Sequence, residues 1–332
     1  GNYNVAVGYA ALSQEDAHGT NVAMGYASLA NLNAGADAYN VAVGYSAGLA
    51  MTTGVNNTLI GGLAGAAVTT GVQNVLIGYL AGDALTVANY NVAVGYGALS
   101  TSVDGDNNTA VGYGALNAFE GGSDEGDNTA IGANSQVNAT TGEFNTSLGS
   151  LSMGTGVTTG NSNVAIGYQS GHALTSGSEN ITIGQGAGDA LTTGNRNVAV
   201  GHAALSTENE HGKNVAIGYL SLLTLDAGVD GFNVAVGYGA GALMTTGVEN
   251  TLIGGQAGDS LTTGTRNVAL GYQALNSEDA HGNNVAIGFA SLYAQDAGTD
   301  AYNTAVGYAS GINVTTGAYN TLIGGLAGDA LT

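Results

Sequence analysis

Apolar and polar residues alternate in a five-residue pattern that returns along the whole chain. The pattern reads Asn, a β-branched residue, a residue that is usually Ala, an aliphatic residue and Gly. It occurs nineteen times, from Asn4-Val5-Ala6-Val7-Gly8 to Asn320-Thr321-Leu322-Ile323-Gly324. Successive Asn residues are 17 positions apart, with occasional spacings of 18, 19 or 20. A unit this short can bury its apolar side only by stacking on its neighbours, so the pattern predicts a repeat fold.

Strict alternation is the period of a β-strand, and Gly at every fifth place excludes a helix. Counting Asn as the first place, we expect the second and fourth side chains to point into a dry core. The third place would then face outward, and its small side chains suggest close approach of another chain. A tight turn on the coil's own surface is the alternative. The candidate inter-chain contact row contains Ala6, Ala23, Ala42, Leu59 and Leu76.

The invariant Asn and Gly each have a physical reason. Stacked Asn side chains can hydrogen-bond along the stack and cap the turn backbone. An invariant Gly marks a positive φ or a close approach of two backbones. Neither residue is catalytic in itself. This predicted structural ladder begins with Asn4, Asn21, Asn40, Asn57 and Asn74, and with Gly8, Gly25, Gly44, Gly61 and Gly78.

The rest of each repeat also has fixed places. The sixth place is Tyr in eleven repeats, which predicts an aromatic ladder that serves structural packing rather than sugar binding. In nearly all repeats the ninth place is either Leu or Met, or else Gly followed three places later by an aliphatic residue. A side chain from the ninth place, or one from three places later, thus fills the same position in the core.

Together these places predict an all-β fold: a parallel β-solenoid of about nineteen coils of 17–20 residues, forming a single domain over residues 1–332. Four-coil blocks at 4–73, 197–266 and 267–332 share the same order of spacings, and diverged coils fill 74–196. Duplication of whole blocks adds coils to the stack without creating a new functional site. Because coils run from residue 4 to the last residue, we expect a section of a longer fibre.

Charge and composition exclude several functions. The chain has 3 basic and 24 acidic residues and a net charge of −21, which removes the positive surface that nucleic acid or an anionic membrane requires. No segment approaches the roughly 20 apolar residues of a transmembrane helix. We therefore expect no nucleic-acid partner and no membrane insertion. Without cysteine, disulfides and thiolate metal sites are also excluded.

No catalytic constellation emerges, so we do not expect an enzyme. His18, His211 and His281 occupy the same duplicated turn, each preceded by acidic residues, and they are the candidates for a divalent metal. An acidic solvated loop explains these turns better. Calcium at Asp-rich loops would fit the charge, but the Gly-Gly-x-Gly-x-Asp pattern of calcium-binding β-rolls is missing. No other cofactor is expected.

The strand pattern resembles the head repeat of YadA-type trimeric autotransporter adhesins, Asn-Ser-Val-Ala-Ile-Gly. Residues 5–8, 129–132 and 215–218 align with its last four residues, and residues 108–116 are similar to repeats of phage tail fibres. The resemblance covers essentially the whole chain, although the coil is longer and Asn adjoins Val without the Ser. It implies a left-handed parallel β-roll, a homotrimeric fibre and a role in surface attachment.

We therefore expect an extracellular structural or adhesive fibre, either a bacterial surface adhesin or a phage tail-fibre shaft, that acts as a rigid rod. Its partners would be copies of itself, as a homotrimer or a head-to-tail stack, with a host cell-surface glycan or protein as a further candidate. A self-assembling head-to-tail filament and an ice-binding β-solenoid are alternatives, although regular Thr-x-Thr rows do not recur. A polysaccharide-cleaving β-helix would need acids clustered with Arg or Lys.

Overall fold

The computed structural model describes residues 1–16, 18–121 and 126–332. These residues contain nineteen β-strands of three residues each and no helix. Accordingly, the described residues include no helix that could cross a membrane. The prediction of an all-β parallel solenoid is confirmed.

Contacts group the chain into two compact units, Gly1–Asn163 and Val164–Thr332, and each is described by itself. The prediction of a single domain over 1–332 stays a prediction. The first unit contains β1 (Val5–Val7), β2 (Val22–Met24), β3 (Val41–Val43), β4 (Thr58–Ile60), β5 (Val75–Ile77), β6 (Val92–Val94), β7 (Thr109–Val111), β8 (Thr129–Ile131) and β9 (Thr146–Leu148). The second contains β10 (Val164–Ile166), β11 (Ile181–Ile183), β12 (Val198–Val200), β13 (Val215–Ile217), β14 (Val234–Val236), β15 (Thr251–Ile253), β16 (Val268–Leu270), β17 (Val285–Ile287), β18 (Thr304–Val306) and β19 (Thr321–Ile323).

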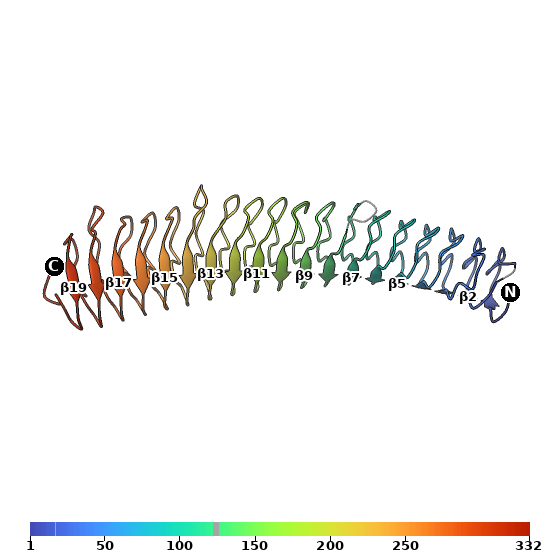
Figure 1. Ribbon diagram of the computed structural model, residues 1–332, viewed down its shortest axis with the longest axis horizontal. Helices are drawn as coiled ribbons and strands as arrows, with labels where there is room; N and C mark the ends of the chain where they lie inside the picture. The colour runs from blue at the N-terminus through green and yellow to red at the C-terminus, as the bar shows by residue number, and fades with distance from the viewer. Residues whose placement is uncertain (17, 122–125) are drawn as a thin grey trace. The chain divides into compact units, whose positions relative to one another are not determined.

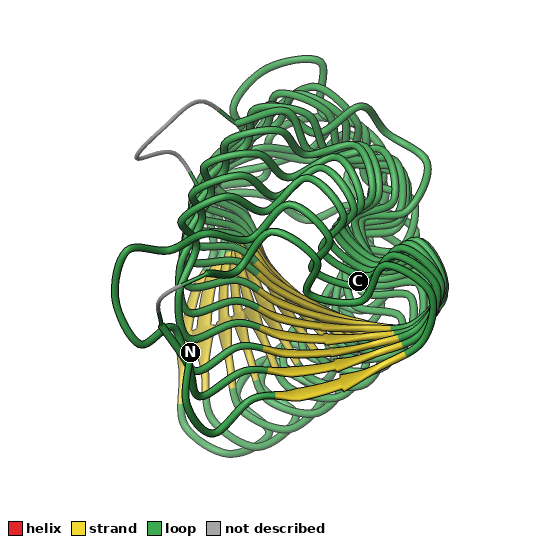
Figure 2. Cartoon of the chain, turned by 90° about the vertical axis from the view of Figure 1, so that its right-hand side faces the viewer, coloured by secondary structure: helices red, strands yellow, loops and turns green. Residues whose placement is uncertain are grey.

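Within each unit the strands lie side by side and point the same way (Figure 1). Each strand pairs in parallel with the next, place for place, as in Val22 with Val41 and Ala23 with Ala42. Such pairing needs a crossover connection, and here the rest of the coil provides it. Viewed along the stack, the strands form one side of the coil and turns close the remainder (Figure 2). Each repeat thus advances the stack by one strand spacing, about 4.8 Å.

The strand side chains point opposite to the predicted direction. The third-place residues Ala23, Ala42, Leu59 and Leu76 are fully buried, so they lie inside the coil and cannot contact another chain. Ala6 occupies the same place in the first coil and is exposed there. The second and fourth places face outward and are only partly covered in most coils. The predicted contact row is therefore wrong.

The physical reason is the narrow interior of the coil. A Cβ added at Gly65, a ninth-place residue, would lie only 2.9 Å from Leu76 Cδ1 and 3.0 Å from Leu59 Cδ2. The third and ninth places therefore share one volume, and close packing lets only one of them be large. The sequence follows this rule: the four coils with Leu at the third place all have Gly at the ninth, as Leu59 with Gly65, Leu76 with Gly82, Leu252 with Gly258 and Leu322 with Gly328.

The ninth and twelfth places fill the core as predicted. Leu29 at the ninth place and Met51 and Leu85 at the twelfth are all fully buried. The ninth-place backbone has a positive φ in both coil types, for example 48° at Leu29 and 60° at Gly48. This conformation favours Gly, which explains why Gly alternates with Leu at this place.

The Asn and Gly ladders are also confirmed. Asn40 and Asn57 are fully buried, and the Asn57 backbone N–H donates to Asn40 Oδ1 at 2.9 Å. Asn40 Nδ2 donates to the turn carbonyl of Gly54 at 2.8 Å. At the strand end, Gly25 has a φ of +136°, and an added Cβ would lie 2.3 Å from the carbonyl oxygen of Gly44 in the next coil. Both reasons proposed for the invariant Gly therefore apply together.

Candidate functional surface

The outward side of each sheet is uncharged and largely apolar. We call the second, fourth and sixth places of the coils in one unit its outer face. Its fourth-place side chains are substantially exposed in both units, for example Leu148 at 46% and Leu270 at 42%. No Asp, Glu, Lys or Arg occupies any of these places in the sequence. The 24 acidic residues of a chain with net charge −21 are thus confined to other sides of the coils.

The sixth place forms the predicted aromatic ladder along the border of the outer face. Tyr9, Tyr26 and Tyr45 stack with ring centroids 5.2 and 5.4 Å apart. In the second unit, Tyr219 and Tyr238 continue the same arrangement at 5.4 Å. The rings remain about half exposed. A hollow of about 170 Å³ lies beside the ladder and is lined by Tyr96, Gly97, Tyr113, Gly114, Asn117, Asn134 and Val137.

All three basic residues stand at the place just before Asn. Arg196, Lys213 and Arg266 all have a positive φ there, between 57° and 63°. Each pairs with an acid one coil away: Arg196 Nε lies 2.6 Å from Glu179 Oε2, and Arg266 Nε lies 2.8 Å from Glu249 Oε2. Lys213 pairs with Asp230. Counting positions from the invariant Asn would have revealed this row of basic residues in the sequence.

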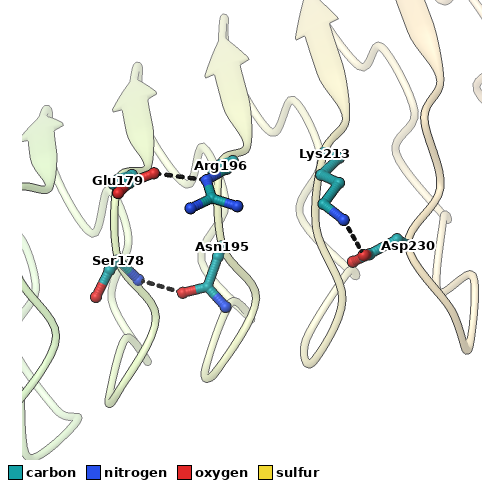
Figure 3. A pocket seen from close by; sticks show the side chains of 6 residues that line it. All are labelled: Ser178, Glu179, Asn195, Arg196, Lys213 and Asp230. Carbon is teal, nitrogen blue, oxygen red and sulfur yellow. Dashed lines mark hydrogen bonds and ion pairs between the residues drawn. The ribbon is translucent and has the colours of Figure 1, made fainter.

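Two of these ion pairs line a hollow of about 360 Å³ (Figure 3). Its walls are Ser178, Glu179, Asn195, Arg196, Lys213 and Asp230. Each of the four charged side chains already has a partner of opposite sign. The hydrogen bond from Lys213 lowers the pKa of Asp230, whereas cleavage of a glycosidic bond needs one carboxyl group with a raised pKa. The hollow therefore does not support polysaccharide cleavage.

The duplicated turns place His18, His211 and His281 next to the Glu three residues earlier. His211 Nδ1 lies 3.8 Å from Glu208 Oε1, and His281 Nδ1 lies 3.5 Å from Glu278 Oε1. Glu208 and Glu278 are fully buried, so the interpretation of these turns as solvated loops is wrong for both carboxylates. Counting places from Asn would have shown this, because both Glu residues occupy the twelfth place, which belongs to the core.

Comparisons with known proteins add no family to this picture. No protein-family model, no curated protein and no solved structure matches the chain. The resemblance to adhesin heads and tail fibres stays a prediction, and the function must be argued from the coils and their outer face.

Proposed function

We propose that the chain is part of an extracellular structural or adhesive fibre that assembles with copies of itself through the outer face. The observation that carries this proposal is the outer face itself, which is uncharged, largely apolar and repeated coil after coil in each unit. Contiguous exposed apolar surface of this kind is typical of interaction sites.

A second copy of the same chain is the partner that the charges favour. Two copies with net charge −21 repel each other wherever their acidic sides meet. The outer face is the one sheet surface on which they can approach without placing like charges opposite one another. We propose a homotrimer, in which three outer faces meet around a common axis, as the resemblance to adhesin heads implies.

The proposal of an attachment fibre is supported by the near-identity of successive coils, as expected of a rod. Each coil repeats the same core, the same Asn and the same Gly, and the charged hollow of the second unit is internally paired. Because the assembled outer faces would cover the Tyr ladder, contact with a host glycan or protein falls to the exposed turns on the other sides of the coils. A bacterial surface adhesin or a phage tail-fibre shaft, touching a host glycan or protein, fits these features.

Sedimentation velocity over a range of concentrations tests the assembly. We expect a particle of three chains of 32.4 kDa. Val94→Lys and Val236→Lys, which place charge on the outer face of each unit, should shift the particle toward a single chain. Thr53→Lys and Thr246→Lys carry the same charge on exposed turns and should leave the mass unchanged. A single chain at every concentration would contradict the proposal, and a mass that grows without limit would favour the head-to-tail filament.

Ice binding is a second candidate because of the corrected strand direction. The second-place Thr residues, expected to point inward, in fact face outward at one strand spacing from coil to coil. They alternate with Val rather than forming continuous rows. Thermal hysteresis in dilute solution would establish this function, and its absence would remove it. The Thr residues concerned are Thr58, Thr109, Thr129, Thr146, Thr251, Thr304 and Thr321.

A further inference from the structure

Three coils place a glutamate where other coils place a core side chain. The twelfth place holds fully buried apolar residues such as Leu32, Met51 and Phe119. In the duplicated turns it holds Glu15, Glu208 and Glu278 instead. Burying a carboxylate is costly unless a partner compensates its charge. A core glutamate repeated in duplicated blocks therefore calls for a counter-charge.

The histidine three residues later faces this carboxylate. The backbone N–H of His281 donates to Glu278 Oε1 at 3.2 Å, which fixes the turn. His281 Nδ1 and Glu278 Oε2 are both buried and have no hydrogen-bond partner within the described parts of the chain. The same holds for Nδ1 of His18 and His211. At Glu278 and His281 a nitrogen and a buried oxygen thus lie together without a hydrogen-bond partner, whereas Glu208 Oε2 accepts from the Ala227 N–H at 3.3 Å.

The next coil adds further oxygen atoms. Ligand atoms of Glu278, Asp279, His281 and Asp296 all lie within 4.8 Å of one another. The equivalent turn of the preceding block brings Glu208, His211 and Asp226 together within the same limit. In both turns an Asp of the following coil anchors the arrangement, since Asp300 Oδ1 accepts from the Gly282 N–H and Asp230 Oδ1 from the Gly212 N–H.

We propose that Glu278, His281 and Asp296, with Asp279 alongside, form a binding site for a divalent transition-metal ion, and that Glu208, His211 and Asp226 form a second. One imidazole nitrogen with two or three carboxylates is a ligand set for Zn²⁺, Co²⁺ or Mn²⁺, whereas Ca²⁺ prefers oxygen alone. The ion neutralises the core glutamate and links two successive coils. This proposal does not depend on self-assembly or adhesion.

The chain contains its own graded comparison. The turn at Glu15 and His18 has Asn33 where the other two have Asp226 and Asp296. With one carboxylate fewer, this turn should bind a divalent ion more weakly. It thus separates the role of the aspartate from that of the Glu–His pair.

Calorimetric titration of the chelator-treated full chain with Zn²⁺ tests the sites. We expect two tight sites per chain, one lost with His281→Gln and both lost with His211→Gln/His281→Gln. Asp296→Asn alters an exposed side chain and should weaken one site by about tenfold or more, the range seen when groups around a metal are removed. His172→Gln/His202→Gln removes two histidines outside the turns and should change nothing.

Cobalt gives an independent readout. Bound Co²⁺ should show visible absorption that is much weaker in the double variant, which keeps only the turn at His18, and Zn²⁺ should raise the thermal midpoint of the wild type more than that of the double variant. If His281 and Glu278 only form an ion pair, Zn²⁺ will show no saturable binding. That result, or unchanged stoichiometry in the His211→Gln/His281→Gln variant, would overturn the proposal.

Discussion

The glycine that ends each strand shows how tightly a single position is constrained. Gly61 has a φ of +137°, and an added Cβ would lie 2.3 Å from the carbonyl oxygen of Gly78. Its neighbour Gly62 stands at the sixth place, with only the edge of the Tyr79 ring 3.3 Å from an added Cβ. Adjacent glycines therefore differ in what they tolerate.

We expect Gly61→Ala to destabilise the first unit by at least about 1–3 kcal/mol, the cost of a strained backbone conformation, and more if the coils must separate. Gly62→Ala should be nearly neutral, since the Tyr79 ring can shift outward. Denaturant midpoints at one fixed protein concentration measure both changes. Equal midpoints for the two variants would show that the strand ends are not packed as described.

Three aspartates at the tenth place give the solenoid a pH dependence. Burial raises the pKa of Asp83, Asp189 and Asp259 above the ordinary value of 3.8. The folded state therefore holds these protons more strongly than the unfolded chain does, and stability falls as pH rises through the raised pKa values. Below the ordinary value both states are protonated and the penalty is absent.

Replacing all three with Asn should therefore raise the thermal midpoint at pH 7 relative to the wild type, and much less at pH 3. Circular dichroism melts at the two pH values measure the difference. An equal gain at both pH values would assign the effect to something other than ionisation.

Within a coil, the shared interior volume decides which residues can be large. Ala110 is fully buried opposite Leu116 and Phe119, which are also fully buried, whereas Val111 faces outward and is partly exposed. The core thus limits the size of the side chain at the third place but not at the fourth.

Ala110→Leu should cost about 1–3 kcal/mol through overpacking, and Val111→Leu should cost little in the isolated chain. The converse change, Leu252→Ala, leaves a cavity opposite Gly258 and should cost about 2–5 kcal/mol. Chemical denaturation measures all three. A larger loss for Val111→Leu than for Ala110→Leu would mean that the strand faces have been assigned the wrong way round.

The stacking of the coils could be predicted from the sequence, but the strand face that forms the core could not. Spacing and alternation determine strand pairing, so the parallel stack and the Asn and Gly ladders could be predicted. Alternation alone cannot say which strand face is inside, and the small side chains at the third place were interpreted as a row for close approach of another chain. The pairing of Leu59 with Gly65 was visible in the sequence and indicates the correct face. The His turns were misjudged because Glu208 and Glu278 were not counted from Asn.

At the scale of the whole molecule, the corrected strand direction moves the proposed contact surface from the third place to the outer face. Ala23 and Ala42 are enclosed, and the aliphatic and aromatic residues around them lie outside. The proposed fibre contact, the second-place Thr rows and the position of the Tyr ladder all depend on this direction. Its direct verification therefore matters more than any single variant of the outer face.

Thiol reactivity measures this direction most directly, because the chain contains no cysteine. Ser147→Cys introduces a thiol at a fully buried third place, and Thr146→Cys introduces one at the exposed second place of the same strand. We expect the thiol from Ser147→Cys to resist a maleimide reagent under native conditions at every concentration. The thiol from Thr146→Cys should react rapidly at high dilution and more slowly as chains assemble. Rapid labelling of the Ser147→Cys variant, with protection of the Thr146→Cys variant even at high dilution, would contradict the account.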